Sequence, residues 1–139
     1  MNMDFDSELK KIPFEDQEID MEQLYCFTEA LEQAPNKREA VPAIFRFFEA
    51  NSDKFLGSPG PLVHFLEKEN DYLIELEKSV LRKPTNLTIW IINRIINAAE
   101  PKDRERWLSI MAAVICHPEA DAEAIQSAKE FIDYQSENI

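Results

Sequence analysis

Apolar residues recur at spacings of three and four along most of the chain, which is the period of an α-helix buried along one face. No segment alternates polar and apolar residues over the length of a strand. A chain of 139 residues with two glycines also has little room for hairpins. Proline and asparagine stand at the breaks between the periodic segments. The pattern therefore predicts an all-α fold of about seven helices.

The breaks predict where each helix begins and ends. The first helix is expected to follow Asp20, whose side chain can cap it, and to end before Pro35. The second is expected to begin at Asn36, with Pro42 delaying its start or bending it. A rigid turn over residues 57–61 precedes a short helix that Ser58 can cap. Further helices are expected from Asn70 or Asp71, from Asn86, from Pro101 and from about Asp121.

The segment 86–98 is apolar nearly all round, so it is predicted to be the central helix, with Trp90 closed to solvent. Asn93, Arg94 and Asn97 interrupt it, and a buried polar group needs a partner. We expect Arg94 to bond carbonyl groups or a carboxylate between helix layers. The alternative is that Arg94 reaches a groove and contacts a partner protein.

The length fits a single domain over residues 1–139. Residues 1–19 are acidic and lack helical periodicity, which indicates an irregular arm, and residues 20–136 form the helical body. Four apolar residues are available to pin the arm to the body: Phe5, Ile12, Phe14 and Ile19. Short links make neighbouring helices antiparallel, so the body is expected to be a stack of helical hairpins like HEAT or armadillo pairs, or else an irregular bundle.

The formal net charge of −12 limits the classes of molecule that the protein can be expected to bind. Such a surface repels nucleic-acid phosphates and anionic lipids, and it steers a basic protein toward it. Two acidic clusters are candidate docking surfaces, although runs of this kind also serve as solvated faces. The N-terminal acidic cluster is Asp16, Glu18, Asp20 and Glu22, and the middle acidic cluster is Glu67, Glu69, Asp71 and Glu75.

The sequence indicates a protein of a reducing compartment. It also contains no segment that is expected to cross a membrane. Cys26 and Cys116 are the two cysteines, and they are too few and too far apart for a disulfide framework. The acidic N-terminus lacks the features of a signal peptide, and the most apolar stretch, residues 87–96, is too short to cross a bilayer. We therefore expect a cytoplasmic protein.

No pattern in the chain indicates catalysis or a cofactor. Gly57 and Gly60 lie in a proline-stiffened turn rather than in a phosphate-binding loop. Cys116 and His117 lack the companions of a zinc site, so we expect a buried cysteine and a histidine that complements a helix C-terminus. No spacing pairs His64 with a nucleophile. We expect no enzyme activity, no metal and no cofactor.

Three segments carry a resemblance to a known family: Gly-Ser-Pro-Gly-Pro-Leu-Val-His at 57–64, Arg-Lys-Pro-Thr at 82–85, and Trp90 to Arg94. They resemble the small helical immunity proteins of bacterial polymorphic-toxin and contact-dependent growth inhibition systems, over residues 57–131. The resemblance implies a cytosolic protein that binds a toxin domain, often a nuclease with a basic cleft, and blocks its active site. The matched residues belong to turns, caps and core, so the resemblance transfers no binding residue.

The acidic charge agrees with this implication, because an inhibitor can present carboxylates where a nuclease binds phosphates. The second interpretation is a helical-repeat adaptor or regulatory protein that binds another protein or a peptide.

Overall fold

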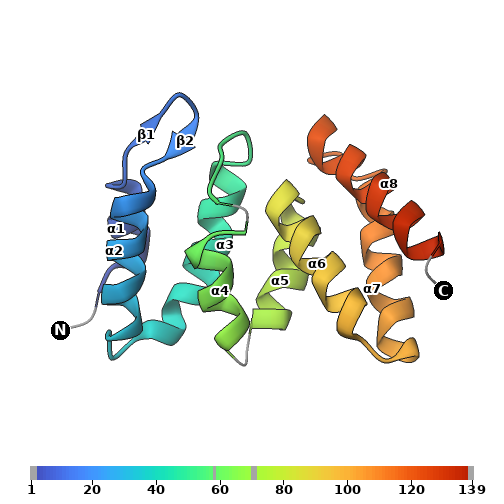
Figure 1. The fold of residues 1–139 in the computed structure, drawn as a ribbon, viewed down its shortest axis with the longest axis horizontal. Helices are drawn as coiled ribbons and strands as arrows, with labels where there is room; N and C mark the ends of the chain where they lie inside the picture. The colour runs from blue at the N-terminus through green and yellow to red at the C-terminus, as the bar shows by residue number, and fades with distance from the viewer. Residues whose placement is uncertain (1–2, 58, 70–71, 138–139) are drawn as a thin grey trace. The chain divides into compact units, whose positions relative to one another are not determined.

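A computed structural model describes residues 3–57, 59–69 and 72–137. These residues form eight α-helices, one short 3-10 helix and one two-stranded hairpin, so the predicted all-α class is confirmed (Figure 1). The cap predicted at Ser58 and the helix start predicted at Asn70 or Asp71 lie outside the described residues. In chain order the elements are α1 (Phe5–Lys10), β1 (Phe14–Glu15), β2 (Glu18–Ile19), α2 (Met21–Glu32), η1 (Lys37–Glu39), α3 (Ala40–Ala50), α4 (Pro61–Lys68), α5 (Tyr72–Arg82), α6 (Asn86–Ala98), α7 (Pro101–Val114) and α8 (Ala122–Glu137).

The chain divides into two compact units, Met1–Glu77 and Lys78–Ile139, and the division falls inside α5. In the first unit, α1 packs against α3 and α2 packs against α4. Helix α3 supplies the largest share of this core, with seven of its eleven residues buried. The rings of Phe45 and Phe48 meet edge to face, with centroids 5.9 Å apart.

The predicted breaks at Pro42 and at the two glycines are borne out. The 3-10 helix η1 delays α3, and Pro42 falls in the first turn of α3, where its missing N–H removes no helical bond. Gly57 and Gly60 have φ values of +119° and +88°. A Cβ atom on Gly57 would lie 2.5 Å from the Cα atom of Gly60, so this turn requires glycine.

The expectation of an irregular arm over residues 1–19 is wrong. Asp4 caps α1 by accepting a hydrogen bond from Ser7 N–H at 3.2 Å, and Phe5 and Leu9 are buried. Arg46 on α3 donates two hydrogen bonds to the carboxylate of Asp6, at 3.3 and 2.8 Å. A helix of six residues shows too little of its period to be read from sequence, and its acidic residues obscure its two buried positions.

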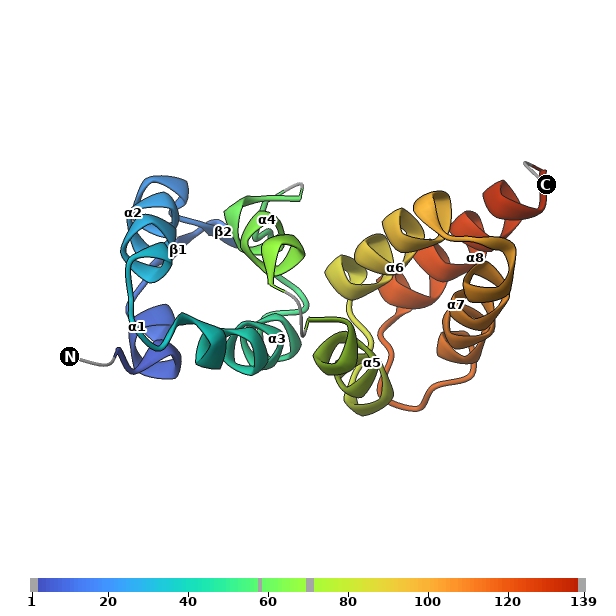
Figure 2. The ribbon, with the colours of Figure 1, turned by 90° about the horizontal axis from the view of Figure 1, so that it is seen from below.

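In the second unit, α6, α7 and α8 pack against one another in all three pairs (Figure 2). Helix α6 begins and ends where the sequence predicts. Thr85 and Thr88 cap it reciprocally: Thr88 N–H donates to Thr85 Oγ1 at 3.2 Å, and Thr85 N–H donates to Thr88 Oγ1 at 2.9 Å. Its buried residues include Ile89, Ile91, Ile92 and Ile96.

One face of α6 nevertheless reaches solvent, so the prediction of a helix closed on all sides is wrong. Trp90 and Ile95 are half-buried, and Arg94 is exposed rather than buried between helix layers. The Arg94 guanidinium lies 5.0 Å from the centre of the Trp90 ring. This cation–π contact covers an aromatic face that would otherwise meet water.

The asparagines that interrupt α6 are not buried, Asn93 being half-buried and Asn97 exposed, but both serve as partners of a buried residue. The Nε2 atom of buried Gln135 on α8 donates to Asn93 Oδ1 at 2.9 Å and to Asn97 Oδ1 at 2.7 Å. Arg104 on α7 donates to the Gln135 carbonyl oxygen at 2.9 Å. Gln135 therefore joins all three helices of this unit through satisfied polar groups.

We expect Ile92→Ala to lower the free energy of unfolding of the second unit by about 2–5 kcal/mol, because Ile92 is fully buried and its loss leaves a cavity. The sequence pattern predicts the same cost for Ile95→Ala, but the half-buried Ile95 should cost less. Both tryptophans lie in this unit, so denaturant unfolding followed by tryptophan fluorescence reports on it. Equal losses for the two variants would contradict the observed burial.

A second prediction concerns Asp6, whose pKa is held below its ordinary 3.8 mainly by the hydrogen bonds from Arg46. Asp6→Asn should destabilise the protein at pH 7 by about 0.2–1 kcal/mol, because the pair is half exposed. Because the pKa of Asp6 is lower in the folded state than in the unfolded state, its carboxylate stabilises the fold at pH values above the unfolded-state pKa. This stabilisation is lost as the pH falls through the folded-state pKa. Urea unfolding followed by circular dichroism should therefore show a difference at pH 7 that disappears by about pH 2.

Candidate functional site

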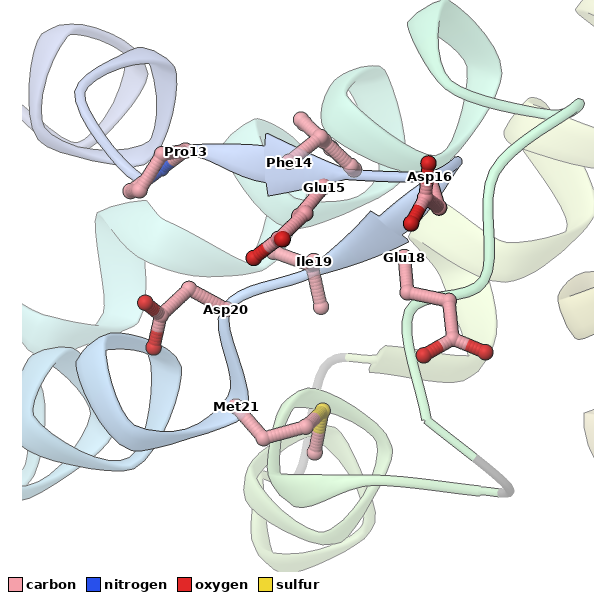
Figure 3. Close-up of a pocket in the computed structure, with 8 residues that line it drawn as sticks. All are labelled: Pro13, Phe14, Glu15, Asp16, Glu18, Ile19, Asp20 and Met21. Atoms are coloured by element: carbon pink, nitrogen blue, oxygen red, sulfur yellow. The ribbon is translucent and has the colours of Figure 1, made fainter.

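The hairpin and the start of α2 line an open hollow of about 520 Å³ in the first unit (Figure 3). Apolar and acidic side chains line it together. The lining residues are Pro13, Phe14, Glu15, Asp16, Glu18, Ile19, Asp20 and Met21. Three members of the predicted N-terminal acidic cluster, Asp16, Glu18 and Asp20, are among them. The fourth, Glu22, is exposed on the first turn of α2 and does not line the hollow.

The backbone of the hairpin explains how these carboxylates are gathered. Phe14 pairs with Ile19 and Glu15 with Glu18, and Asp20 N–H donates to the Pro13 carbonyl oxygen at 2.9 Å. The two turn residues, Asp16 and Gln17, have φ values of +51° and +70°. Positive φ at both positions is the requirement of the two-residue turn that suits the twist of a hairpin.

The sequence indicates no hairpin here, and that expectation is wrong. Glycine usually fills such turns, and neither turn residue here is glycine. Aspartate tolerates a left-handed conformation better than most residues, but glutamine adopts it rarely. The turn therefore holds Gln17 in an unfavourable conformation, which the surrounding contacts must offset.

Those contacts come from the side chains of the hairpin and from the loop before α4. Ile19 is buried, and the Phe14 ring stacks on Phe47 with centroids 6.4 Å apart. Phe55 N–H donates to the Gln17 carbonyl oxygen at 2.8 Å, and Ile19 N–H donates to the Phe55 carbonyl oxygen at 3.0 Å. Phe55 thus extends the hairpin with a parallel bridge beside Glu18, and its own side chain remains 46% exposed.

The carboxylates of the hairpin lack compensation within the fold. Glu15 and Glu18 lie directly opposite each other, where like charges are destabilising. Within the described part of the chain, no cation pairs with Glu15, Asp16 or Glu18. Asp20 differs, because its Oδ1 accepts a hydrogen bond from Gln23 N–H at 3.0 Å and caps α2 as predicted. The three exposed carboxylates are therefore available to an outside partner.

The middle acidic cluster is engaged inside the fold to a greater extent. Glu67, Glu69 and Glu75 are half-buried, and Asp71 lies outside the described residues. Glu67 lies 3.8 Å from the Nδ1 atom of His64, and Glu67 and Glu75 have further partners. Of the two predicted clusters, the N-terminal one is thus the better exposed and the less compensated.

The division into units also divides the charge. Residues 1–77 contain 18 acidic and seven basic residues, a net charge of −11. Residues 78–139 contain nine acidic and eight basic residues, a net charge of −1. Nearly all of the excess negative charge therefore belongs to the unit that contains the hollow.

Other candidate chemistry remains scattered. No group of three or more histidine, cysteine or acidic residues that could hold a metal ion occurs among the described residues. Cys116 is exposed, so the expectation that it is buried is wrong; it lies in the turn after α7, beyond the buried stripe of that helix, and Cys26 is exposed as well. No helix in the described part of the chain is long and apolar enough to cross a membrane.

Comparison of the chain with protein-family models, curated proteins and solved structures found no match. The geometry of the chain is therefore the basis for the functional assignment.

Sequence reasoning missed two members of the site. Glu15 immediately precedes the named cluster, and its place in the hollow depends on the unrecognised hairpin. Phe55 lies more than thirty residues away in the sequence. Only tertiary hydrogen bonds bring its backbone beside Glu18, so no local pattern could have indicated it.

We expect Glu15→Gln and Glu18→Gln each to stabilise the first unit by a few tenths of a kcal/mol, because either change removes the repulsion across the hairpin. Glu22→Gln is the matched control, since Glu22 is exposed outside the hairpin. Urea unfolding followed by circular dichroism would measure the gain, which should shrink as added salt screens the charges. A loss of stability in both variants would mean that these carboxylates support the hairpin.

Proposed function

We propose that the protein is a cytoplasmic immunity protein, which binds a cognate bacterial nuclease toxin domain and neutralises it by covering its basic active-site surface. The observation that carries this proposal is the hollow of the first unit, lined by apolar side chains and by carboxylates, of which Glu15, Asp16 and Glu18 pair with no cation in the described part of the chain. The docking surface is the N-terminal acidic cluster extended by Glu15. The resemblance over residues 57–131 supports the same class of function.

The chemistry of the hollow suits a basic partner. A lysine or arginine side chain can lay its methylene stem against the accessible lining residues Pro13 and Met21 while its charged head meets carboxylates. The exposed ring of Phe55 beside Glu18 adds a surface for cation–π contact. An active site that binds phosphates would therefore meet carboxylates in their place.

The uneven charge adds a kinetic reason. A unit of net charge −11 attracts a basic domain over distances longer than direct contact and raises the rate of productive encounter. The same field repels nucleic acid and anionic lipids, so neither is proposed as a ligand. No step of this function requires catalysis by the chain or a cofactor.

The second candidate is a helical adaptor that binds another protein or a peptide. One observation favours it: α5 exposes Leu73, Ile74 and Leu81, of which the last two are 61% and 68% exposed. Residues seven positions apart share a face of a helix, so Ile74 and Leu81 form an apolar stripe. An adaptor would bind through this stripe, and its affinity would depend little on salt.

We expect association with the cognate toxin domain to depend on the hairpin carboxylates. The partner is first identified by pull-down from the native strain and mass spectrometry, and association kinetics are then measured at low and physiological salt. The triple change Glu15→Gln, Asp16→Asn and Glu18→Gln should slow association about tenfold at low salt, because it weakens steering. Physiological salt should reduce the difference in association rate between the wild type and the triple variant, since it screens charges beyond about 8–10 Å.

Three exposed carboxylates of the second unit provide the matched control for this experiment: Glu105→Gln, Glu123→Gln and Glu137→Gln remove the same charge. This control triple should bind at nearly the wild-type rate. The corresponding changes at Glu67, Glu69 and Glu75 test the middle acidic cluster. Rates that respond neither to salt nor to the hairpin triple would refute the proposed surface, and loss of binding on Ile74→Ser with Leu81→Ser would favour the adaptor.

A further inference from the structure

The His117 ring joins the end of α5 to the turn between α7 and α8, and both of its nitrogen atoms are engaged. Nε2 lies 2.7 Å from the carbonyl oxygen of Leu81. Nδ1 lies 3.0 Å from the backbone nitrogen of Glu119. Figure 2 shows the link between α7 and α8 passing beside the end of α5.

The two partners determine the protonation state of the ring. A backbone carbonyl only accepts hydrogen bonds, so Nε2 must carry a hydrogen and donate it to Leu81. A backbone N–H only donates, so Nδ1 must present its lone pair to Glu119. Both bonds exist together only in the neutral ring with its hydrogen on Nε2.

The backbone of the same residue organises the turn that follows. His117 N–H donates to the Val114 carbonyl oxygen at 3.0 Å, and Ala120 N–H donates to the His117 carbonyl oxygen at 3.2 Å. Asp121 then caps α8 by accepting a hydrogen bond from Ala124 N–H at 2.9 Å. The ring of His117 thus stabilises, through its side chain, the backbone turn that leads from α7 to the cap of α8.

We propose that His117 is a proton-operated latch, in which uptake of a proton from solvent at Nδ1 releases the Glu119 N–H and loosens the α7–α8 turn. The new N–H bond at Nδ1 occupies the lone pair that Glu119 uses, and it places two donors against each other. The bond from Nε2–H to Leu81 survives, because that hydrogen is present in both states. Protonation therefore breaks the hydrogen bond between the ring and the turn, and it leaves the hydrogen bond between the ring and α5 in place.

The surroundings allow the ring to take up charge without leaving its place. The carbonyl ends of α5 and α7 both lie at His117, and the C-terminal ends of helices stabilise a cation. The charged side chains on the adjoining segments are Lys78, Arg82 and Lys83 at the end of α5, and Glu119 and Asp121 in the turn. No carboxylate in the described chain forms an ion pair with the ring. Release of the Glu119 amide is consequently the change that protonation imposes.

Nuclear magnetic resonance of the whole protein can test the latch directly. At pH 8 the nitrogen shifts of His117 should report a neutral ring with the hydrogen on Nε2. Between pH 8 and pH 5, where histidines ordinarily change charge, the protection factor of the Glu119 amide should fall about tenfold, which is the size of effect expected from one hydrogen bond. Protection of the Ala124 amide, bonded to Asp121, serves as the internal reference.

The chain has two histidines, so His64 provides a matched control. His64→Gln should retain the fall in Glu119 protection, whereas His117→Gln should abolish it, because glutamine can donate to Leu81 and accept from Glu119 without titrating. A hydrogen on Nδ1 at pH 8, or a protection factor that is equal at both pH values in the wild type, would overturn the proposal. So would a pH response that persists in His117→Gln. The wild-type measurements decide the question even where a variant folds poorly.

Discussion

Two strands of two residues each cannot hold a hairpin by themselves, so the acidic turn of the first unit depends on the hydrogen bonds that join it to Phe55. A glycine turn follows Phe55 closely in the chain. Gly57 and Gly60 approach so closely that no Cβ atom fits between them, and their left-handed conformations return the chain to α4. The backbone of Phe55, two residues before this turn, therefore holds the hairpin that places Glu15, Asp16 and Glu18.

The hairpin is also where the fold accepts its clearest unfavourable features. It holds Gln17 at positive φ and places two glutamates opposite each other, and the described part of the chain offers its exposed carboxylates no cation. Asp6 in the same unit differs, because Arg46 donates two hydrogen bonds to its carboxylate. Local conflict within a consistent structure is typical of functional sites. Concentration of the negative charge in this unit is consistent with that interpretation.

The second unit differs from the hairpin, because its buried polar groups are paired by hydrogen bonds. Gln135 bonds both asparagines of α6, and Arg104 bonds the backbone of Gln135. Such a network specifies how three helices pack, because a shift of any one of them would leave buried groups unsatisfied. His117 plays a similar part at the end of this unit, with the difference that its ring can change its charge.

The sequence alone determined the helical class, the start and end of α6, the Asp20 cap and the glycine turn. These features follow from local rules: apolar periodicity, side-chain capping and the conformations that glycine permits. It also indicated that Asn93 and Asn97 need partners, but it could not name Gln135, which lies about forty residues away.

Tertiary structure decided the rest. Helix α1 is too short to show a period, so its burial against α3 becomes evident only in the fold. The outer face of α6 depends on which neighbours cover it, and sequence periodicity cannot show that Trp90 is covered by Arg94. The N-terminal acidic cluster was visible as charge, but its shape required the hairpin, and the hairpin required Phe55. Hydrogen bonds between segments far apart in the sequence leave no local pattern, which is why only the folded chain could assemble this site.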